Sequence, residues 1–334
     1  MKQLANLDAR IPKWKHHDLV ERNCPICMSE GHEKYIRPDN LLIKYCSTCK
    51  TYFVSPSPSE TQLRFFYSKY DDMHRRDASW KTELTDRYQL NDFLSDFRLQ
   101  EIGSIVDLKE KVCLDVGFGR GFFLYGFKLL GASSCGVELD PKAILYAKKY
   151  LGIESVIQGT IFDLNDNTKY DVILMNDFIE HPLDPFNSFQ KAASMLKDEG
   201  LLAILTPNAS FVAENDEPII FRVDLEHMQY FFFKTCFYLA NAAGLEIVHL
   251  ESLGFPYLNG IDKLPNKDLP RIPIKIVLKN AIKSLPGFQV ANNIRRSFLK
   301  KKPAIEPDHR AGNYHLFCIF QKSSERLIQR GLQV

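Results

Sequence analysis

Short apolar runs alternate with amphipathic helical patterns through the central part of the chain. The apolar runs are continuous, which is typical of parallel strands that are buried on both faces. We expect strands at 112–116, 134–140, 155–159, 170–176 and 201–208 and helices at 122–130, 141–150 and 185–197. A strand–helix alternation of this kind predicts a doubly wound α/β fold with right-handed crossovers. A helix follows at 234–243, and strands at 245–250 and 314–320 would form an antiparallel-edged end of the sheet.

A glycine-rich turn follows the first of these strands, where residues 115–121 read Asp-x-Gly-x-Gly-x-Gly. In a doubly wound sheet such a turn lets a ligand approach bare backbone at the carboxyl end of the strand. The second strand carries Glu138, about twenty residues after the glycines, where a carboxylate can accept the hydroxyls of a ribose. A dinucleotide fingerprint would have its third glycine at Phe122, so the spacing favours a ligand with a cationic amino group over a nicotinamide cofactor. The alternative is that the turn serves only the packing of the helix on the strand and binds no ligand.

Two Cys-x-x-Cys pairs stand near the N-terminus, at Cys24 and Cys27 and at Cys46 and Cys49, with 18 residues between the pairs. Pairs at this separation match a tetrahedral zinc site with four thiolates, while a redox-active pair is the alternative. Short strands expected at 35–37 and 41–45 would complete a zinc ribbon. Because so small a module buries little apolar surface, we expect the zinc to be structural.

The composition is that of an ordinary soluble protein, with 45% hydrophobic and 25% charged residues among 334. A formal net charge of +2 disfavours a general nucleic-acid binder. No apolar run reaches the ~18 residues of a membrane span, and the first residues lack the apolar core of a signal peptide. The eight cysteines divide into the two pairs and four single thiols, which favours a cytoplasmic location.

The turn at 115–121, Glu138 and the later Thr206-Pro207-Asn208 resemble motifs of the class I S-adenosylmethionine-dependent methyltransferases. The similarity extends over 24–250 to small-molecule methyltransferases with an N-terminal four-cysteine zinc module, many of which act on sugars. It implies a Rossmann-like seven-stranded sheet, a small N-terminal zinc ribbon and a helical insertion before the last strand.

The resemblance also implies how S-adenosylmethionine is held, with Asp115 near its amino group and Glu138 on its ribose. The usual acidic contact to adenine is absent, because the position after the third strand is Thr160, so Ile161 and Phe162 are the expected neighbours of the ring. Tyr67 and Tyr70, on a helix expected at 61–70, resemble an aromatic segment that covers the cofactor, with plain packing as the alternative. The full expected set is Asp115, Gly117, Gly119, Gly121, Glu138, Thr160, Ile161, Asn176 and Tyr70.

A second informative stretch follows the fourth strand and contains Asp177, Glu180 and His181, which we expect to converge in one helical turn. With the distant His227, it resembles the divalent-metal set of some O-methyltransferases, such as the ubiquinone-biosynthesis and small-RNA 2′-O enzymes, with Asp177 in place of their first Glu. Mg²⁺ or another divalent cation there would orient the acceptor hydroxyl and lower its pKa. Two alternatives remain: a metal-free histidine base at position 181 or 227, and a Glu180–His181 pair that only caps the helix.

The chain divides into four expected parts. They are a zinc-ribbon module at 1–58, a helical linker or lid at 59–106, a catalytic domain at 107–250 with 312–323, and a basic helical insertion at 251–311. Within the linker, a second helix is expected at about 80–106. We interpret the insertion as a solvated cap, with peripheral membrane contact through 272–302 or a protomer contact as alternatives.

We expect methyl transfer to a hydroxyl of a sugar, as a nucleotide-sugar or saccharide, or of another small metabolite. An RNA methyltransferase whose zinc ribbon binds nucleic acid is the first alternative, and a non-catalytic binding protein is the second. No oligomeric state is predicted.

Overall fold

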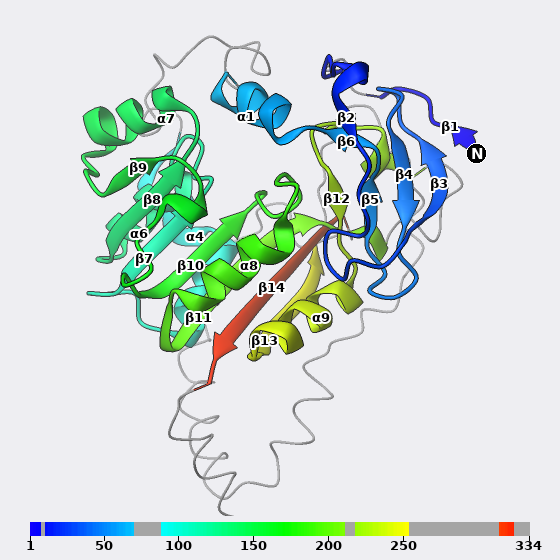
Figure 1. Ribbon diagram of the computed structural model, residues 1–334. Coiled ribbons are helices and arrows are strands. Elements are labelled where there is room, and N and C mark those ends of the chain that lie inside the picture. Colours follow the sequence, from blue (N-terminus) through cyan, green and yellow to red (C-terminus); the bar gives the residue numbers. More distant parts are fainter. Residues whose placement is uncertain (8–10, 70–87, 211–217, 254–313, 324–334) are drawn as a thin grey trace, which may run out of the picture.

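The computed structural model describes residues 1–7, 11–69, 88–210, 218–253 and 314–323. These residues form a large sheet covered by helices and a smaller N-terminal module beside it (Figure 1). Tyr70 and the part of the expected insertion from residue 254 onward, including 272–302, lie outside them. In the part of the chain that is described, no helix combines the length and apolar character that a bilayer crossing needs.

The large sheet contains seven strands. In chain order they are β7 (Val112–Val116), β8 (Ser133–Glu138), β9 (Val156–Gln158), β10 (Tyr170–Asn176), β11 (Leu196–Pro207), β13 (Leu245–Leu253) and β14 (His315–Lys322). Their order across the sheet is β13-β14-β11-β10-β7-β8-β9. The strands from β11 to β9 are parallel, and β14 is antiparallel to both β11 and β13. This is the doubly wound, mostly parallel sheet with an antiparallel end that the sequence predicts.

Seven α-helices connect or flank these strands in the described residues. They are α1 (Glu60–Ser68), α4 (Leu90–Ser95), α5 (Phe97–Ile105), α6 (Phe122–Leu129), α7 (Pro141–Tyr146), α8 (Pro185–Ser194) and α9 (Phe233–Ala243). Asp140 and Asp184 cap α7 and α8 through their side chains, and each is followed by a proline at the first helical position.

Two expected boundaries are wrong for local reasons. The helix expected at about 80–106 is interrupted at Asp96, whose carboxylate accepts hydrogen bonds from the first amides of α5 and so begins a new helix. The helix expected to end at 197 ends at Ser194, and β11 begins already at Leu196 instead of 201.

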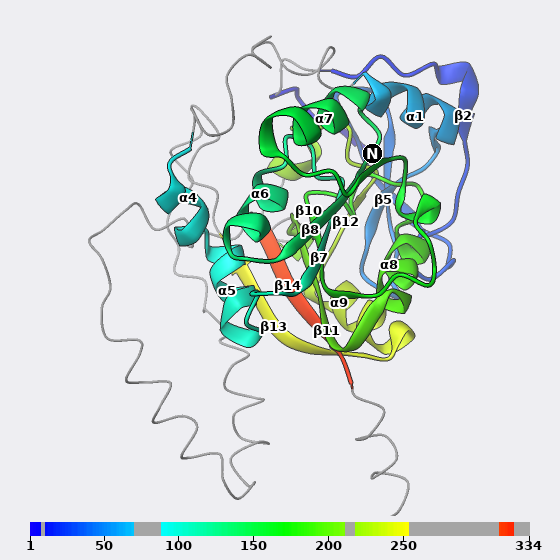
Figure 2. The same cartoon turned by 90° about the vertical axis from the view of Figure 1, so that its left-hand side faces the viewer.

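Alternate side chains of the central strands enter two separate apolar clusters, one on each face of the sheet. Leu114 packs in the cluster that contains Phe189 of α8, whereas its neighbour Cys113 packs in the cluster that contains Phe127 of α6. Figure 2 shows the corresponding helices, with α5 and α6 on one side of the sheet and α8 and α9 on the other. Burial of both faces explains why these strands read as continuous apolar runs.

The N-terminal module is a second sheet whose last strand comes from a distant part of the chain. It contains β1 (Lys2–Gln3), β3 (His32–Ile36), β4 (Leu42–Tyr45), β5 (Tyr52–Val54) and β12 (Gln229–Tyr230), in this order. A separate short pair joins β2 (Leu19–Val20) to β6 (Ser57–Pro58). Figure 1 shows β12, which precedes α9, beside β5. The sequence gives no signal for this pairing.

The module also shares its apolar interior with the larger part of the molecule. Tyr52 and Ile43 of the module lie in one buried cluster with Phe221 and Met228. Because the module buries its side chains against the domain, it does not depend on a core of its own.

Candidate functional site

A cavity of about 1260 Å³ opens at the carboxyl ends of the parallel strands. Its walls come from the glycine turn after β7, the ends of β8 and β10, the turn after β9, helix α1 and the segment 224–227. The start of β14, which is antiparallel, contributes Tyr314 and His315. This is the edge of a doubly wound sheet where ligands bind.

The turn after β7 requires glycine for two different reasons. Gly117, Gly119 and Gly121 all have positive φ angles, of 69°, 53° and 81°, which residues with side chains rarely adopt. A Cβ at Gly117 would lie 2.7 Å from the ring of Phe178, so a side chain there would collide. A Cβ at Gly119 would meet nothing within 4 Å, because this residue faces the open cavity with bare backbone.

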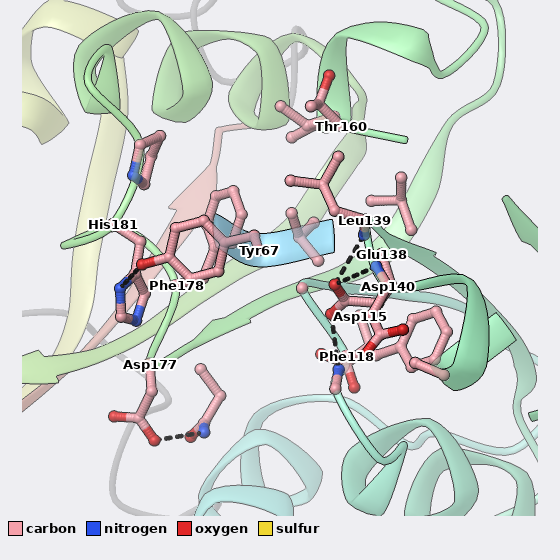
Figure 3. Close-up of a pocket in the computed structure, with 18 of the residues that line it drawn as sticks. Tyr67, Asp115, Phe118, Glu138, Leu139, Asp140, Thr160, Asp177, Phe178 and His181 are labelled. Carbon is pink, nitrogen blue, oxygen red and sulfur yellow. Dashed lines mark hydrogen bonds between the residues drawn. The ribbon is translucent and has the colours of Figure 1, made fainter. Parts of the chain in front are cut away.

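Glu138 ends β8 with its carboxylate fixed by the backbone and facing the cavity (Figure 3). Its Oε1 accepts hydrogen bonds from the amides of Leu139 at 2.7 Å and Asp140 at 3.1 Å, and its Oε2 accepts one from Gly119 at 2.9 Å. Burial raises the pKa of Glu138, although these hydrogen bonds favour the ionised form and oppose the increase. A carboxylate can accept about four hydrogen bonds, and three are used here. Oε2 can therefore accept one more, from a ligand hydroxyl.

Asp115, at the end of β7, is a buried carboxyl group with an unsatisfied oxygen. It is 2% exposed, and its Oδ2 has no hydrogen-bond partner among the described residues. Burial, followed by the charge of Glu138, raises the pKa of Asp115 to about 8. A positively charged ligand group beside it would reverse that shift.

The turn after β9 forms an apolar wall of the cavity. Thr160 caps a 3-10 turn, since its Oγ1 accepts from the amide of Phe162 at 3.3 Å and donates to Asp163 at 2.8 Å. The hydroxyl of Thr160 is thereby used within the turn, while Ile161 and the half-exposed Phe162 line the cavity. Both expected neighbours of adenine thus line the cavity, and their contact with the ring stays a prediction.

Residues 177–183 do not form the expected helical turn. Asp177 has a positive φ of 47°, which directs the chain into an irregular turn. Its carboxylate accepts a hydrogen bond from the side-chain Nδ2 of Asn176 at 2.9 Å and lies 3.8 Å from Nε2 of His315. Asn176 in turn accepts from Arg98 at 2.9 Å. Asp177 thus lines the cavity without joining the cluster that Glu180 forms.

Glu180, His181 and His227 converge, with one potential ligand atom from each lying within 4.8 Å of the others. Glu180 is fully buried, and within the described residues its carboxylate oxygens make no hydrogen bond of normal geometry, although the hydroxyl of Thr206 is near enough to favour the ionised form. The nearest imidazole nitrogen, His227 Nε2, is 3.9 Å from Oε1. Burial, followed by the charge of Asp177, raises the pKa of Glu180 well above its usual range. A buried carboxylate without well-placed donors is costly, and a cation is a group that would stabilise it.

His181 is held by a tyrosine from the N-terminal part of the chain (Figure 3). The hydroxyl of Tyr67, on α1, lies 2.7 Å from Nδ1 of His181 and donates to the carbonyl of Glu226 at 3.4 Å. The direction of the bond to Nδ1 depends on the tautomer of His181. In the tautomer with the proton on Nδ1, the ring donates to the Tyr67 hydroxyl and its lone pair lies on Nε2. Burial and the neighbouring His227 lower the pKa of His181 to about 3, so its ring is neutral.

The four cysteines of the module form a second cluster, away from the cavity. The sulfur of Cys24 lies 3.3 Å from that of Cys49, that of Cys27 lies 3.4 Å from that of Cys46, and all four are within 4.8 Å of one another. A zinc tetrahedron with Zn–S bonds of about 2.3 Å has S–S edges of about 3.8 Å, so the arrangement fits this ion. The short contacts cross between the two pairs, whereas a redox site would join the cysteines within one pair.

Comparison with known proteins finds methyltransferases among the similar sequences. Residues 85–250 match a family model described as a methyltransferase domain. The ubiquinone biosynthesis O-methyltransferase of Marinobacter nauticus is 33% identical over 124 residues, which cover 34% of this chain and 52% of that protein. The enzyme of the same name from Azoarcus sp. is 28% identical over 162 residues, 47% of this chain and 65% of that protein.

One solved methyltransferase structure has a weak similarity to this chain. It is the Burkholderia thailandensis 1,6-didemethyltoxoflavin-N1-methyltransferase with bound 1,6-didemethyltoxoflavin and S-adenosylhomocysteine. It is 17% identical, with a TM-score of 0.45, and the match covers 88% of this chain and all of that one. The chain spans about half the length of the curated relative from Marinobacter. The family model spans most of the sheet, the glycine turn and Glu138, and the chain contains a class I S-adenosylmethionine-dependent methyltransferase domain.

Proposed function

We propose that this protein transfers the methyl group of S-adenosylmethionine to a hydroxyl oxygen of a small molecule. The observation that carries the proposal is the single cavity that joins the Glu138 end of the glycine turn to the buried Glu180–His181–His227 cluster. One end of this cavity suits a nucleoside, and the other end holds groups that can bind and deprotonate a hydroxyl.

The residues at the first end fit the cofactor. Glu138 presents an oxygen to the ribose, Asp115 lies where the amino group can meet a carboxylate, and Gly119 offers bare backbone. Ile161 and Phe162 supply an apolar surface for the adenine ring. When bound, the cofactor supplies a methyl group on a sulfonium, which is ready for in-line displacement.

The residues at the second end must align the acceptor and remove one proton. We propose that Glu180, His181 and His227 bind a divalent cation, which would lower the pKa of the acceptor hydroxyl. The buried carboxylate of Glu180, which lacks a hydrogen bond of normal geometry, and the neutral ring of His181 support this version over a metal-free base at His181, whose lowered pKa weakens it as a base. A metal-free base at His227 is the alternative.

We take sugars as the first acceptor class to test. Asp184 and Asp224 line the same cavity, and carboxylates readily accept hydrogen bonds from neighbouring hydroxyls. The near-neutral composition agrees with a small-molecule acceptor more than with RNA.

We further propose that the four cysteines bind a structural zinc ion. Four thiolates close the tetrahedron and leave no position for a substrate. The hydroxyl of Thr51 lies 3.2 Å from the sulfur of Cys49 and 3.2 Å from the hydroxyl of Thr235, which connects the cluster to the start of α9.

The proposed reaction is tested with purified protein, labelled S-adenosylmethionine and a panel of nucleotide-sugars, saccharides and small hydroxyl compounds. We expect transfer of label that a chelator abolishes and Mg²⁺ restores, because a hard divalent cation suits the carboxylate and imidazole ligands. Mg²⁺ would not bind to the four thiolates after chelation, so rescue by Mg²⁺ would indicate that the required cation binds in the cavity. Label on RNA alone, or on no acceptor, contradicts the proposed reaction, and chelator-resistant transfer contradicts the cation.

Replacement of Glu138 tests the cofactor end of the cavity. We expect Glu138→Gln to weaken S-adenosylmethionine binding about 10- to 100-fold, because hydrogen bonds to a charged group are lost while the shape is kept. Isothermal titration calorimetry measures the change. Glu154→Gln, at an exposed position away from the cavity, should bind as the wild type does. Equal affinities of both variants would place the nucleoside elsewhere.

Cofactor binding should release a proton from Asp115 near neutral pH. With its pKa raised to about 8, the carboxyl is protonated in the ligand-free protein at pH 7. The cofactor's cationic amino group favours the ionised form, so the affinity should rise with pH up to about pH 8. Calorimetry at pH 7 in buffers of different ionisation enthalpy counts the proton. Asp115→Asn cannot release this proton, so it measures any protons that the cofactor itself releases. If both proteins release the same number of protons on binding, the prediction is wrong.

The cysteine cluster should retain one zinc ion per chain through purification. Cys27→Ser should lose the metal and lower the melting temperature, because binding of a structural zinc contributes to folding. Cys135→Ser, a partly buried thiol of β8, is the matched control and should keep the metal. Native mass spectrometry gives the zinc content. A metal-free, fully folded wild type with disulfides within the two pairs would instead establish redox-active cysteines.

A further inference from the structure

A fully buried arginine of the N-terminal module reaches into the segment that carries His227. Arg37 follows β3 and is 0% exposed. Its Nη1 donates to the carbonyl of His227 at 2.5 Å and to the hydroxyl of Tyr230 at 3.2 Å, and its Nη2 donates to the carbonyl of Leu225. The carbonyls of Leu225 and His227 stand on either side of Glu226, so Arg37 holds the backbone of a wall of the cavity.

The charge of Arg37 is balanced within the module. Nε donates to Oδ1 of Asp39 at 3.0 Å and Nη2 donates to Oδ2, and Asp39 also accepts from the indole of Trp14 at 3.0 Å. All five N–H donors of the guanidinium therefore have partners, in the forked geometry that only arginine provides. A lysine in this place would keep the ion pair with Asp39, but three donors on a single nitrogen cannot reproduce the five bonds that the planar guanidinium makes.

A second arginine acts on the adjoining backbone. Arg22 donates to the carbonyl of Leu183 at 2.9 Å and to that of Met228 at 2.6 Å, and so joins the turn after Glu180 to the segment after His227. The amide of Met228 donates to the carbonyl of Glu180 at 2.8 Å, which brings the same two segments together.

The segment itself has little regular structure to hold it. Asp224, at its start, has a positive φ of 48°, and regular pairing begins only at β12. The hydrogen bonds from the module are therefore a principal constraint on where the His227 ring lies.

We propose that Arg37 is a positioning residue for the catalytic centre, which sets the backbone of Leu225–His227 so that His227 faces Glu180 and His181. The inference rests on the proposed function, since it assigns those three residues to the reaction. The N-terminal module then builds one wall of the catalytic cavity, instead of serving only as a separate recognition element.

The test is Arg37→Lys, which keeps the buried positive charge and removes the planar guanidinium group with its five donors. We expect kcat for methyl transfer to fall about 10- to 100-fold, as for other groups that orient ligands through hydrogen bonds, with KM for S-adenosylmethionine nearly unchanged. Lys44→Gln is the matched control, because Lys44 pairs with Glu21 at 3.0 Å in the same module and does not line the cavity. It should retain the wild-type kcat.

A spectroscopic readout separates positioning from general stability and does not require turnover. The ring signals of His181 and His227, assigned in NMR spectra through single His→Gln substitutions, should move in Arg37→Lys, whereas the signal of His249 on β13 should stay. If no acceptor is methylated by the wild-type protein, the proposed function fails, and the ring signals still decide the role of Arg37.

A second variant covers the case in which Arg37→Lys does not fold, as loss of part of a buried ion pair can cause. Arg37→Gln combined with Asp39→Asn removes both charges together and leaves an amide pair. We expect the same selective loss of kcat and the same shifted ring signals. An unchanged kcat with unmoved rings in a folded variant overturns the proposal, as does a parallel loss of cofactor binding, which would indicate a merely structural role.

Discussion

Burial of both faces of a parallel sheet leaves polar side chains few places except the strand ends. In this chain the carboxyl ends of β7, β8, β9 and β10 lie along one edge, so the glycine turn, Glu138, the Thr160 turn and His181 line one cavity although they are far apart in sequence. The apolar clusters on the two faces fix the strand order, and the strand order fixes which of these groups can meet.

The electrostatic character of the cavity follows from this crowding. Asp115 and Glu180 are buried and Glu138 is partly buried. The pKa of each carboxyl group is raised, and in each case the first cause is the loss of water around the acid. Ionisation of these carboxyl groups is unfavourable in the ligand-free cavity, and a bound positively charged ligand would stabilise their ionised forms. A sulfonium nucleoside with a cationic amino group at one end, and a divalent cation at the other, would supply it.

The sequence predicts what is local and periodic. The apolar runs, the capped helices and the glycine turn are in the described structure because each depends on neighbouring residues, as at Asp140 and Gly119. It misses what depends on contacts across the chain or on one unusual dihedral angle. The pairing of β12 with β5 and the fork of Arg37 join residues nearly two hundred positions apart, and the left-handed backbone of Asp177 replaces the helical turn expected there.

One feature of the sheet bears on how such a protein can diversify. Leu253, at the end of β13, and His315, at the start of β14, are register partners, so the chain leaves the sheet and re-enters it at the same point, where His315 also borders the cavity. Lengthening a connection whose ends are already adjacent costs little, on the order of 0.6 kcal/mol per doubling. The length of this connection can therefore change at little cost, while the register of β13 and β14 and the position of Glu138 stay the same.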